Sequence, residues 1–282
     1  MRSWFEGMHM VPRRLKAGKG EQAIPQPVKE IGRLLSAAID GSSIKRLIPY
    51  KLTHLVPWRA VLRNAKVAWS QLQFSVEFSL FVPQKPLDAG QLRSAGAQSL
   101  GFGSVTGIDF KDEAVAFAEA WGTNASISQP CTAAKVREAF ETGKTVLISC
   151  HGVTSEGRLF LELQAENSGN SHKVDPKECL PEQMSVPLLI LSACLSGVYM
   201  MDDGDNPFGF APMALRRGAS RVVCYRWEIG ASFAKEMVVG LASQIQRLPT
   251  VEAAFVSILS ELETNGSDLW QELACVELLG QG

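Results

Sequence analysis

The sequence predicts an α/β fold, with a mostly parallel sheet that carries helices on both faces. Along most of the chain, short apolar runs alternate with segments of helical periodicity, which is the pattern of successive β-α units. Two runs, at residues 146–148 and 188–191, are apolar without alternation, as expected of central parallel strands buried on both faces. With 282 residues, of which 46% are hydrophobic, the chain can fill a large core.

The expected elements begin with a basic arm. We assign residues 1–44 to this arm and to a short helix that starts at Pro27 and ends near Gly41, and residues 45–282 to the main domain. Short apolar runs predict strands at residues 75–82, 145–150, 159–163, 186–192 and 220–225. Helical spacing of apolar residues predicts helices at residues 112–121, 132–140, 207–217, 232–247 and 251–262. The fourth helix has the clearest apolar face, and Thr250 is a suitable N-cap for the fifth.

Composition and charge exclude several classes of protein. The 28 Lys and Arg residues against 29 Asp and Glu residues leave a net charge of -1, so we expect no direct binding of nucleic acid. The longest uncharged stretch, residues 183–201, is interrupted by Pro and Gly and is too short in its apolar part to cross about 30 Å of hydrocarbon. We therefore expect no membrane association.

The cysteines and histidines indicate neither a disulfide framework nor a metal site. No apolar export signal follows the basic N-terminus, so we expect a cytoplasmic protein whose six cysteines are thiols. No Cys-x-x-Cys pair occurs and the four histidines are scattered, which argues against zinc. The acidic stretch 202–206 lacks the glutamate of a calcium loop. We expect no metal and no other cofactor.

Two predicted strands end in residues that can carry chemistry. One strand runs into His151 and Gly152, and another runs into Cys194. Ligands bind at the carboxyl ends of strands in an open parallel sheet, so His151 and Cys194 meet if these strands are neighbours. Histidine can then serve as base for the thiol and as acid for a leaving amine, with the amides of Gly152 and Cys194 as an oxyanion hole. A cysteine that only packs as a small hydrophobe is the alternative that spacing leaves open.

The segments around these residues, 148–152 with 159–161 and 189–197, resemble the paired His-Gly and Ser-Ala-Cys signatures of the CHAT proteases, a branch of the caspase-like and separase-like cysteine peptidases. Further matches follow in the order of that family, over roughly residues 45–265, at residues 47–49, 54–58, 112–119, 132–136, 208–219 and 221–227. The resemblance implies a caspase-like α/β fold. It also implies that Cys194 is the nucleophile, His151 the general base and acid, and Gly152 an oxyanion contributor.

The sequence departs from the family pattern in two places. Where the family often has Trp-x-Val-x-Asp, this chain has Ala231 in place of the aspartate. A pocket bounded by Trp227, Glu228 and Ala231 is therefore expected to favour an apolar residue before the scissile bond. Glu228, together with Asp202, Asp203 and Asp205 of the adjoining loop, can instead favour a basic residue. The tetratricopeptide repeats that often precede this domain are not seen, so we expect regulation by the arm or by a separate protein.

The function expected from these residues is a cysteine endopeptidase that hydrolyses peptide bonds of a partner protein through a thioester. The loop at residues 196–208 mixes glycines and aspartates, and we expect a regulatory protein or cleavage to order it. Two alternatives stay open. One is a catalytically silent domain that binds a protein partner with the same sheet edge, and the other is a cysteine amidase that acts on a small amide.

Overall fold

The computed structural model describes residues 30, 32–34, 61, 76–77, 85–103, 109–155, 158–166, 170–198, 200–201, 207–265 and 270–280. Its strands are β1 (Val76–Glu77), β2 (Ala97–Gly101), β3 (Ala125–Ser128), β4 (Thr145–Ser149), β5 (His151–Ser155), β6 (Arg158–Gln164), β7 (Ser171–Val174), β8 (Leu188–Ser192), β9 (Met200–Met201), β10 (Pro207–Phe208), β11 (Arg221–Tyr225) and β12 (Val276–Gly280). Its longer helices are α4 (Ala89–Ala95), α5 (Lys111–Trp121), α6 (Ala133–Ala139), α7 (Pro176–Cys179), α8 (Phe210–Arg216), α9 (Ala231–Arg247), α10 (Val251–Asn265) and α11 (Trp270–Cys275).

The main sheet of the described chain has seven strands in the order β1-β12-β11-β8-β4-β2-β3. The five strands from β11 to β3 are parallel to one another, while β12 is antiparallel to β11 and parallel to β1. Every residue of β4, β8 and β11 is buried, which explains why these strands read as continuous apolar runs. The predicted fold class, a mostly parallel sheet with helices on both faces, is confirmed.

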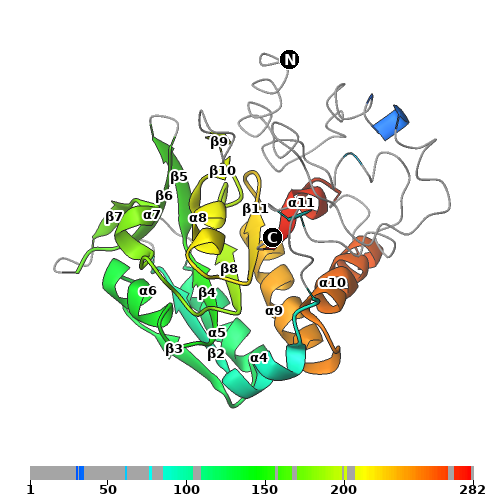
Figure 1. The fold of residues 1–282 in the computed structure, drawn as a ribbon, viewed down its shortest axis with the longest axis horizontal. Helices are drawn as coiled ribbons and strands as arrows, with labels where there is room; N and C mark the ends of the chain where they lie inside the picture. Colours follow the sequence, from blue (N-terminus) through cyan, green and yellow to red (C-terminus); the bar gives the residue numbers. More distant parts are fainter. Residues whose placement is uncertain are drawn as a thin grey trace.

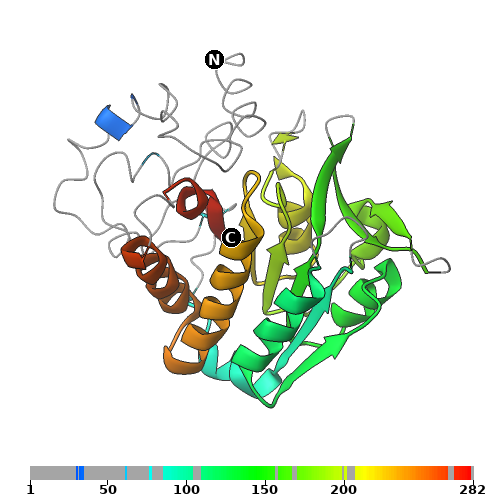
Figure 2. The ribbon, with the colours of Figure 1, turned by 180° about the vertical axis from the view of Figure 1, so that it is seen from behind.

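Helices cover the two faces of this sheet (Figure 1, Figure 2). Helices α5 and α9 pack side by side on one face, and α6 and α8 lie on the other. Helix α10 packs against α9 at close range: a Cβ on Gly240 of α9 would lie 2.1 Å from Ile258 Cδ1 of α10, so a larger residue there would require the Ile258 side chain to move. None of the helices in the described part is both long and apolar enough to cross a membrane.

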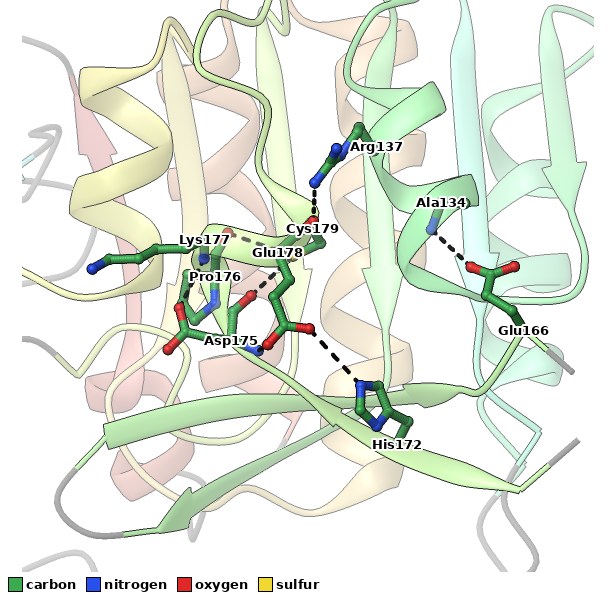
Figure 3. Close-up of polar contacts among 9 residues, drawn as sticks. All are labelled: Ala134, Arg137, Glu166, His172, Asp175, Pro176, Lys177, Glu178 and Cys179. Atoms are coloured by element: carbon green, nitrogen blue, oxygen red, sulfur yellow. Dashed lines mark hydrogen bonds and ion pairs between the residues drawn. The ribbon is translucent and has the colours of Figure 1, made fainter. Parts of the chain in front are cut away.

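A second, three-stranded antiparallel sheet, β5-β6-β7, continues the chain directly from the end of β4 (Figure 1). Helix α7 follows β7 and begins with a capping box between Asp175 and Glu178. His172 Nε2 of β7 also lies 3.8 Å from Glu178 Oε2, and the backbone carbonyl of Glu178 accepts a hydrogen bond from Arg137 of α6 (Figure 3). These contacts tie the small sheet, which carries His151 at its start, to the helical layer of the domain.

Most predicted elements are found with shifts of one or two residues, and Thr250 caps α10 as predicted by accepting from Ala253 N at 3.2 Å. The helix predicted at 207–217 starts too early. Pro207–Phe208 pairs with Met200–Met201 as a short antiparallel ribbon, and the helix begins only at Phe210. The strand predicted at 75–82 is described only as β1, and most of the helix predicted from Pro27 lies outside the described residues. The domain boundary at residue 45 stays a prediction.

Candidate active site

His151 and Cys194 lie beyond the ends of two neighbouring strands, as predicted. Strands β4 and β8 are parallel neighbours with Ser149 opposite Ser192, and each candidate residue follows two positions later. The two chain segments touch beyond the strands, because a Cβ on Gly152 would lie 1.7 Å from the carbonyl oxygen of Cys194. Glycine is therefore required at position 152 for the two segments to approach. The carboxyl edge of the sheet brings His151, Gly152 and Cys194 together.

The Cys194 thiol is the most accessible of the six thiols. Its side chain is partly exposed, whereas the other five cysteines are buried. Burial nevertheless raises the pKa of the Cys194 thiol, and the charges of Glu228 and Glu113 act in the same direction. The thiol donates to the carbonyl oxygen of Ile229 at 3.9 Å, a bond that only the protonated thiol can make. In this arrangement Cys194 is a protonated thiol at neutral pH.

The His151 ring packs against an aromatic residue at the start of α5. Its centroid lies 4.7 Å from that of Phe110, with the two rings at 89°. Among the described residues no hydrogen bond joins this ring to Cys194 Sγ, and the thiol donates to the carbonyl oxygen of Ile229 instead. Formation of a Cys-His pair therefore requires the thiol to leave the Ile229 carbonyl.

The segment that follows β11 runs beside the Cys194 loop. Leu195 N donates to Trp227 O at 3.4 Å and Gly197 N donates to Tyr225 O at 2.8 Å. Trp227 packs partly against the core, while Glu228 and Ala231 are exposed. Asp203 and Asp205, the other predicted pocket residues, lie outside the described residues.

A buried ion pair anchors this segment to the sheet. Arg226 Nε lies 2.7 Å from Glu277 Oε1, and both side chains are almost completely buried. Arg226 N also donates to Cys275 O at 3.0 Å, and Trp227 N donates to Cys275 Sγ at 3.2 Å. The ion pair and these bonds hold the end of β11 to β12, next to Trp227.

One buried acid at the site has no role in the sequence-based interpretation. Glu113 of α5 is 4% exposed, and burial raises the pKa of its carboxyl to about 7. The hydroxyls of Ser149 and Ser192 lie near it and lower the pKa in part. The spacing of Phe110, Glu113 and Phe117 places this acid on the buried face of α5, which is the signal that could have identified it.

No group of three or more potential metal ligands occurs among the described residues.

Comparisons with known proteins agree with this architecture. The chain is similar to the solved structure of the Arg-specific cysteine proteinase gingipain R, with a TM-score of 0.55 and 12% identity over 99% of this chain and 75% of that one. It is also similar to the complex of the pro- and mature domains of RgpB from Porphyromonas gingivalis, with a TM-score of 0.52 and 9% identity over the same shares of the two chains. These likenesses show the fold of a caspase-like cysteine proteinase.

Comparison of the sequence with curated proteins gives no match. The family model of the CHAT domain, in contrast, matches residues 29–257, which include both strand ends of the candidate site. This match extends over most of the sequence, and the chain therefore belongs to the CHAT domain family.

Proposed function

We propose that the chain is a cysteine endopeptidase in which Cys194 is the nucleophile and His151 the general base and acid. The observation that carries this proposal is the position of the two residues at equivalent places beyond neighbouring parallel strands. The partial exposure of Cys194 supports it, since a nucleophile must be reached by its substrate. The fold, shared with cysteine proteinases, supports the same chemistry.

The reaction would use these groups in two stages. His151 takes the proton of the Cys194 thiol, and the thiolate attacks the carbonyl carbon of the scissile bond. The amides of Gly152 and Cys194 are the proposed donors to the resulting oxyanion. His151 then gives its proton to the leaving amine, which departs and leaves a thioester. In the second stage His151 takes a proton from water, the hydroxide attacks the thioester, and the thiol is restored with release of the carboxyl product.

We further propose that the isolated chain is a resting form that a regulatory protein or cleavage activates. The raised pKa of Cys194 and the bond of its thiol to Ile229 support this, because both oppose thiolate formation. The described part carries six free cysteines, which supports a location in the reducing cytoplasm. Neither a nucleic acid nor a membrane has a part in this proposal.

The residue before the scissile bond is proposed to lie against Trp227, Glu228 and Ala231. An aromatic wall and a small side chain suit an apolar residue, whose burial returns roughly 1.5 to 3 kcal/mol. A basic residue would need a carboxylate, and Glu228, Asp203 and Asp205 are the candidates that this segment and the adjoining loop offer. The proteinase of the structural comparison is described as Arg-specific, so an experiment must distinguish a preference for an apolar residue from a preference for a basic one.

A panel of peptides with a covalent thiol-reactive group and varied side chains tests the proposal. We expect labelling of Cys194, fastest for an apolar residue at the position next to the reactive group, and a large loss of labelling in His151→Ala. His172→Ala is the matched control, because His172 is exposed on β7 and its solvent-exposed pair with Glu178 contributes little, so labelling should be unchanged. Labelling that is independent of peptide sequence and of His151 would contradict an endopeptidase.

The catalytically silent binding domain is the second candidate, and the resting thiol favours it. A protein that only binds a partner has no need for an ionised Cys194, and the thiol hydrogen-bonded to Ile229 suits that role. Partner capture that survives Cys194→Ala, together with no peptide labelling of the wild type, would favour this candidate.

A further inference from the structure

Four buried polar side chains meet near the strand ends that lead to His151 and Cys194, on the face of the sheet covered by α5. Ser149, Ser192 and Tyr225 are the last residues of β4, β8 and β11, and Glu113 reaches them from α5. All four are at most 4% exposed. The charge of Glu113 acts on Cys194, Cys150 and Tyr225, which places the carboxyl within electrostatic range of the nucleophile.

These side chains form an incomplete hydrogen-bond set. Glu113 Oε1, Ser149 Oγ, Ser192 Oγ and Tyr225 OH make no hydrogen bond of ordinary geometry in the described part of the chain, although Ser192 and Ser149 lie close enough to lower the pKa of Glu113 and Ser192 that of Tyr225. Unsatisfied buried polar groups are uncommon and costly, so four at one place need a physical explanation. A protonated carboxyl resolves part of the cost, since it has a proton to donate to a neighbouring hydroxyl and carries no buried charge.

We propose that Glu113 is a positioning residue of the active site that makes the reactivity of Cys194 depend on pH. Its carboxyl lies among the hydroxyls of Ser149 and Ser192, at the ends of the two strands that lead to His151 and Cys194. When ionised, it opposes formation of the Cys194 thiolate. This role rests on the proposed function, because it acts through the proposed nucleophile.

The surroundings of Glu113 determine when this change occurs. Burial raises the pKa of the carboxyl to about 7, and the hydroxyls of Ser192 and Ser149 and the charge of Lys235 on α9 act against this rise. Lys235 is exposed, so water screens its contribution. Strands β2, β3, β4 and β8 contain no charged residue. Among the described residues, the charge of Glu113 also acts on the Cys150 and Cys194 thiols and the Tyr225 hydroxyl, whose pKa values are all raised.

The test measures the rate at which iodoacetamide alkylates Cys194 between pH 6 and pH 8.5, by mass spectrometry of the Cys194 peptide. Glu113→Gln keeps the size of the side chain and removes its charge. We expect this variant to match the wild type at pH 6 and to react about twofold to fivefold faster at pH 8.5. The range assumes a change of about one pKa unit in the thiol, reduced by the lower nucleophilicity of a more acidic thiol.

Two further variants complete the test. Glu119→Gln makes the same substitution at an exposed position of α5 and should follow the wild type at every pH. Ser192→Ala removes a hydroxyl that lowers the pKa of Glu113, so the bend in the wild-type rate profile should move to higher pH. An identical profile in Glu113→Gln and the wild type, or a uniform change at every pH, would overturn the proposal. If Glu113→Gln does not fold, a bend that stays in place in Ser192→Ala would overturn it alone.

This test separates the role of Glu113 from the proposed function. Alkylation is measured on the thiol itself and requires no peptide cleavage. The expected pH profile in a chain that cleaves no peptide would contradict the endopeptidase and support the role of Glu113. Peptide cleavage that depends on Cys194, together with an alkylation profile that Glu113→Gln does not change, would support the endopeptidase and contradict the role of Glu113.

Discussion

Glu113→Gln should stabilise the folded protein, and more so at pH 8 than at pH 5. The folded protein holds the proton of Glu113 up to a pKa of about 7, while an ordinary glutamate releases it at 4.5. Between these values the unfolded chain gives up a proton that the folded chain keeps. Wild-type stability therefore falls as pH rises through this window, and the loss is complete above pH 7. Glutamine has no proton to release, so the variant escapes the loss.

The size of this effect follows from the two pKa values. The full rise corresponds to about 3 kcal/mol, of which about 2.5 kcal/mol develops between pH 5 and pH 8. Because Glu113 is 4% exposed, solvent screening does not reduce this figure substantially. We expect the difference in free energy of unfolding between Glu113→Gln and the wild type to grow by this amount over that interval.

Urea unfolding followed by tryptophan fluorescence at pH 5 and pH 8 measures this difference directly. Glu119→Gln, at an exposed position of the same helix, is the matched control and should differ little from the wild type at either pH. Equal differences for Glu113→Gln at both pH values would show that Glu113 is an ordinary surface-like acid and would refute the reasoning.

Three further predictions concern the groups around the dyad. Iodoacetamide should label Cys194 before the other five cysteines, which are buried, and peptide mapping that finds Cys150 or Cys224 first would contradict this. Gly152→Ala should abolish peptide cleavage and cost about 1 to 3 kcal/mol in urea unfolding, since its methyl group would meet the Cys194 carbonyl at 1.7 Å; full activity would refute the close approach. Arg226→Met should cost about 3 to 5 kcal/mol because it leaves Glu277 buried without its ion-pair partner, and an added Glu277→Leu should restore most of the loss.

The central strands and the strand-end residues were predictable because burial on both faces leaves a plain apolar signal. Strand β12 was missed for the opposite reason. Its second residue is Glu277, and the ion pair with Arg226 makes a charged residue acceptable at that buried place. Strand β2 contains Gln98 and Ser99, and the hydroxyl of Ser99 is satisfied by Ala114 O at 2.9 Å from α5. Such partners come from distant parts of the chain, so a local pattern does not reveal them.

The candidate site was predictable where it depends on strand order and missed where it depends on packing. His151, Gly152 and Cys194 follow from two strand ends and one topological rule. The hydrogen bond from Cys194 to Ile229 and the cluster around Glu113 require several elements to be placed in space first. An acid in the first turn of a helix also suits the helix dipole, which gives Glu113 an ordinary explanation in sequence alone.

Peptide cleavage by the wild type, Cys194→Ala, His151→Ala and the double variant tests the central claim most directly. A peptide library, incubated for long times with each purified chain, detects even the weak cleavage expected of a resting form. We predict that each single substitution abolishes cleavage and that the double variant loses little more, because the two groups act as one unit. Cleavage that persists in Cys194→Ala, or its absence from the wild type, would contradict the account of a Cys194/His151 endopeptidase.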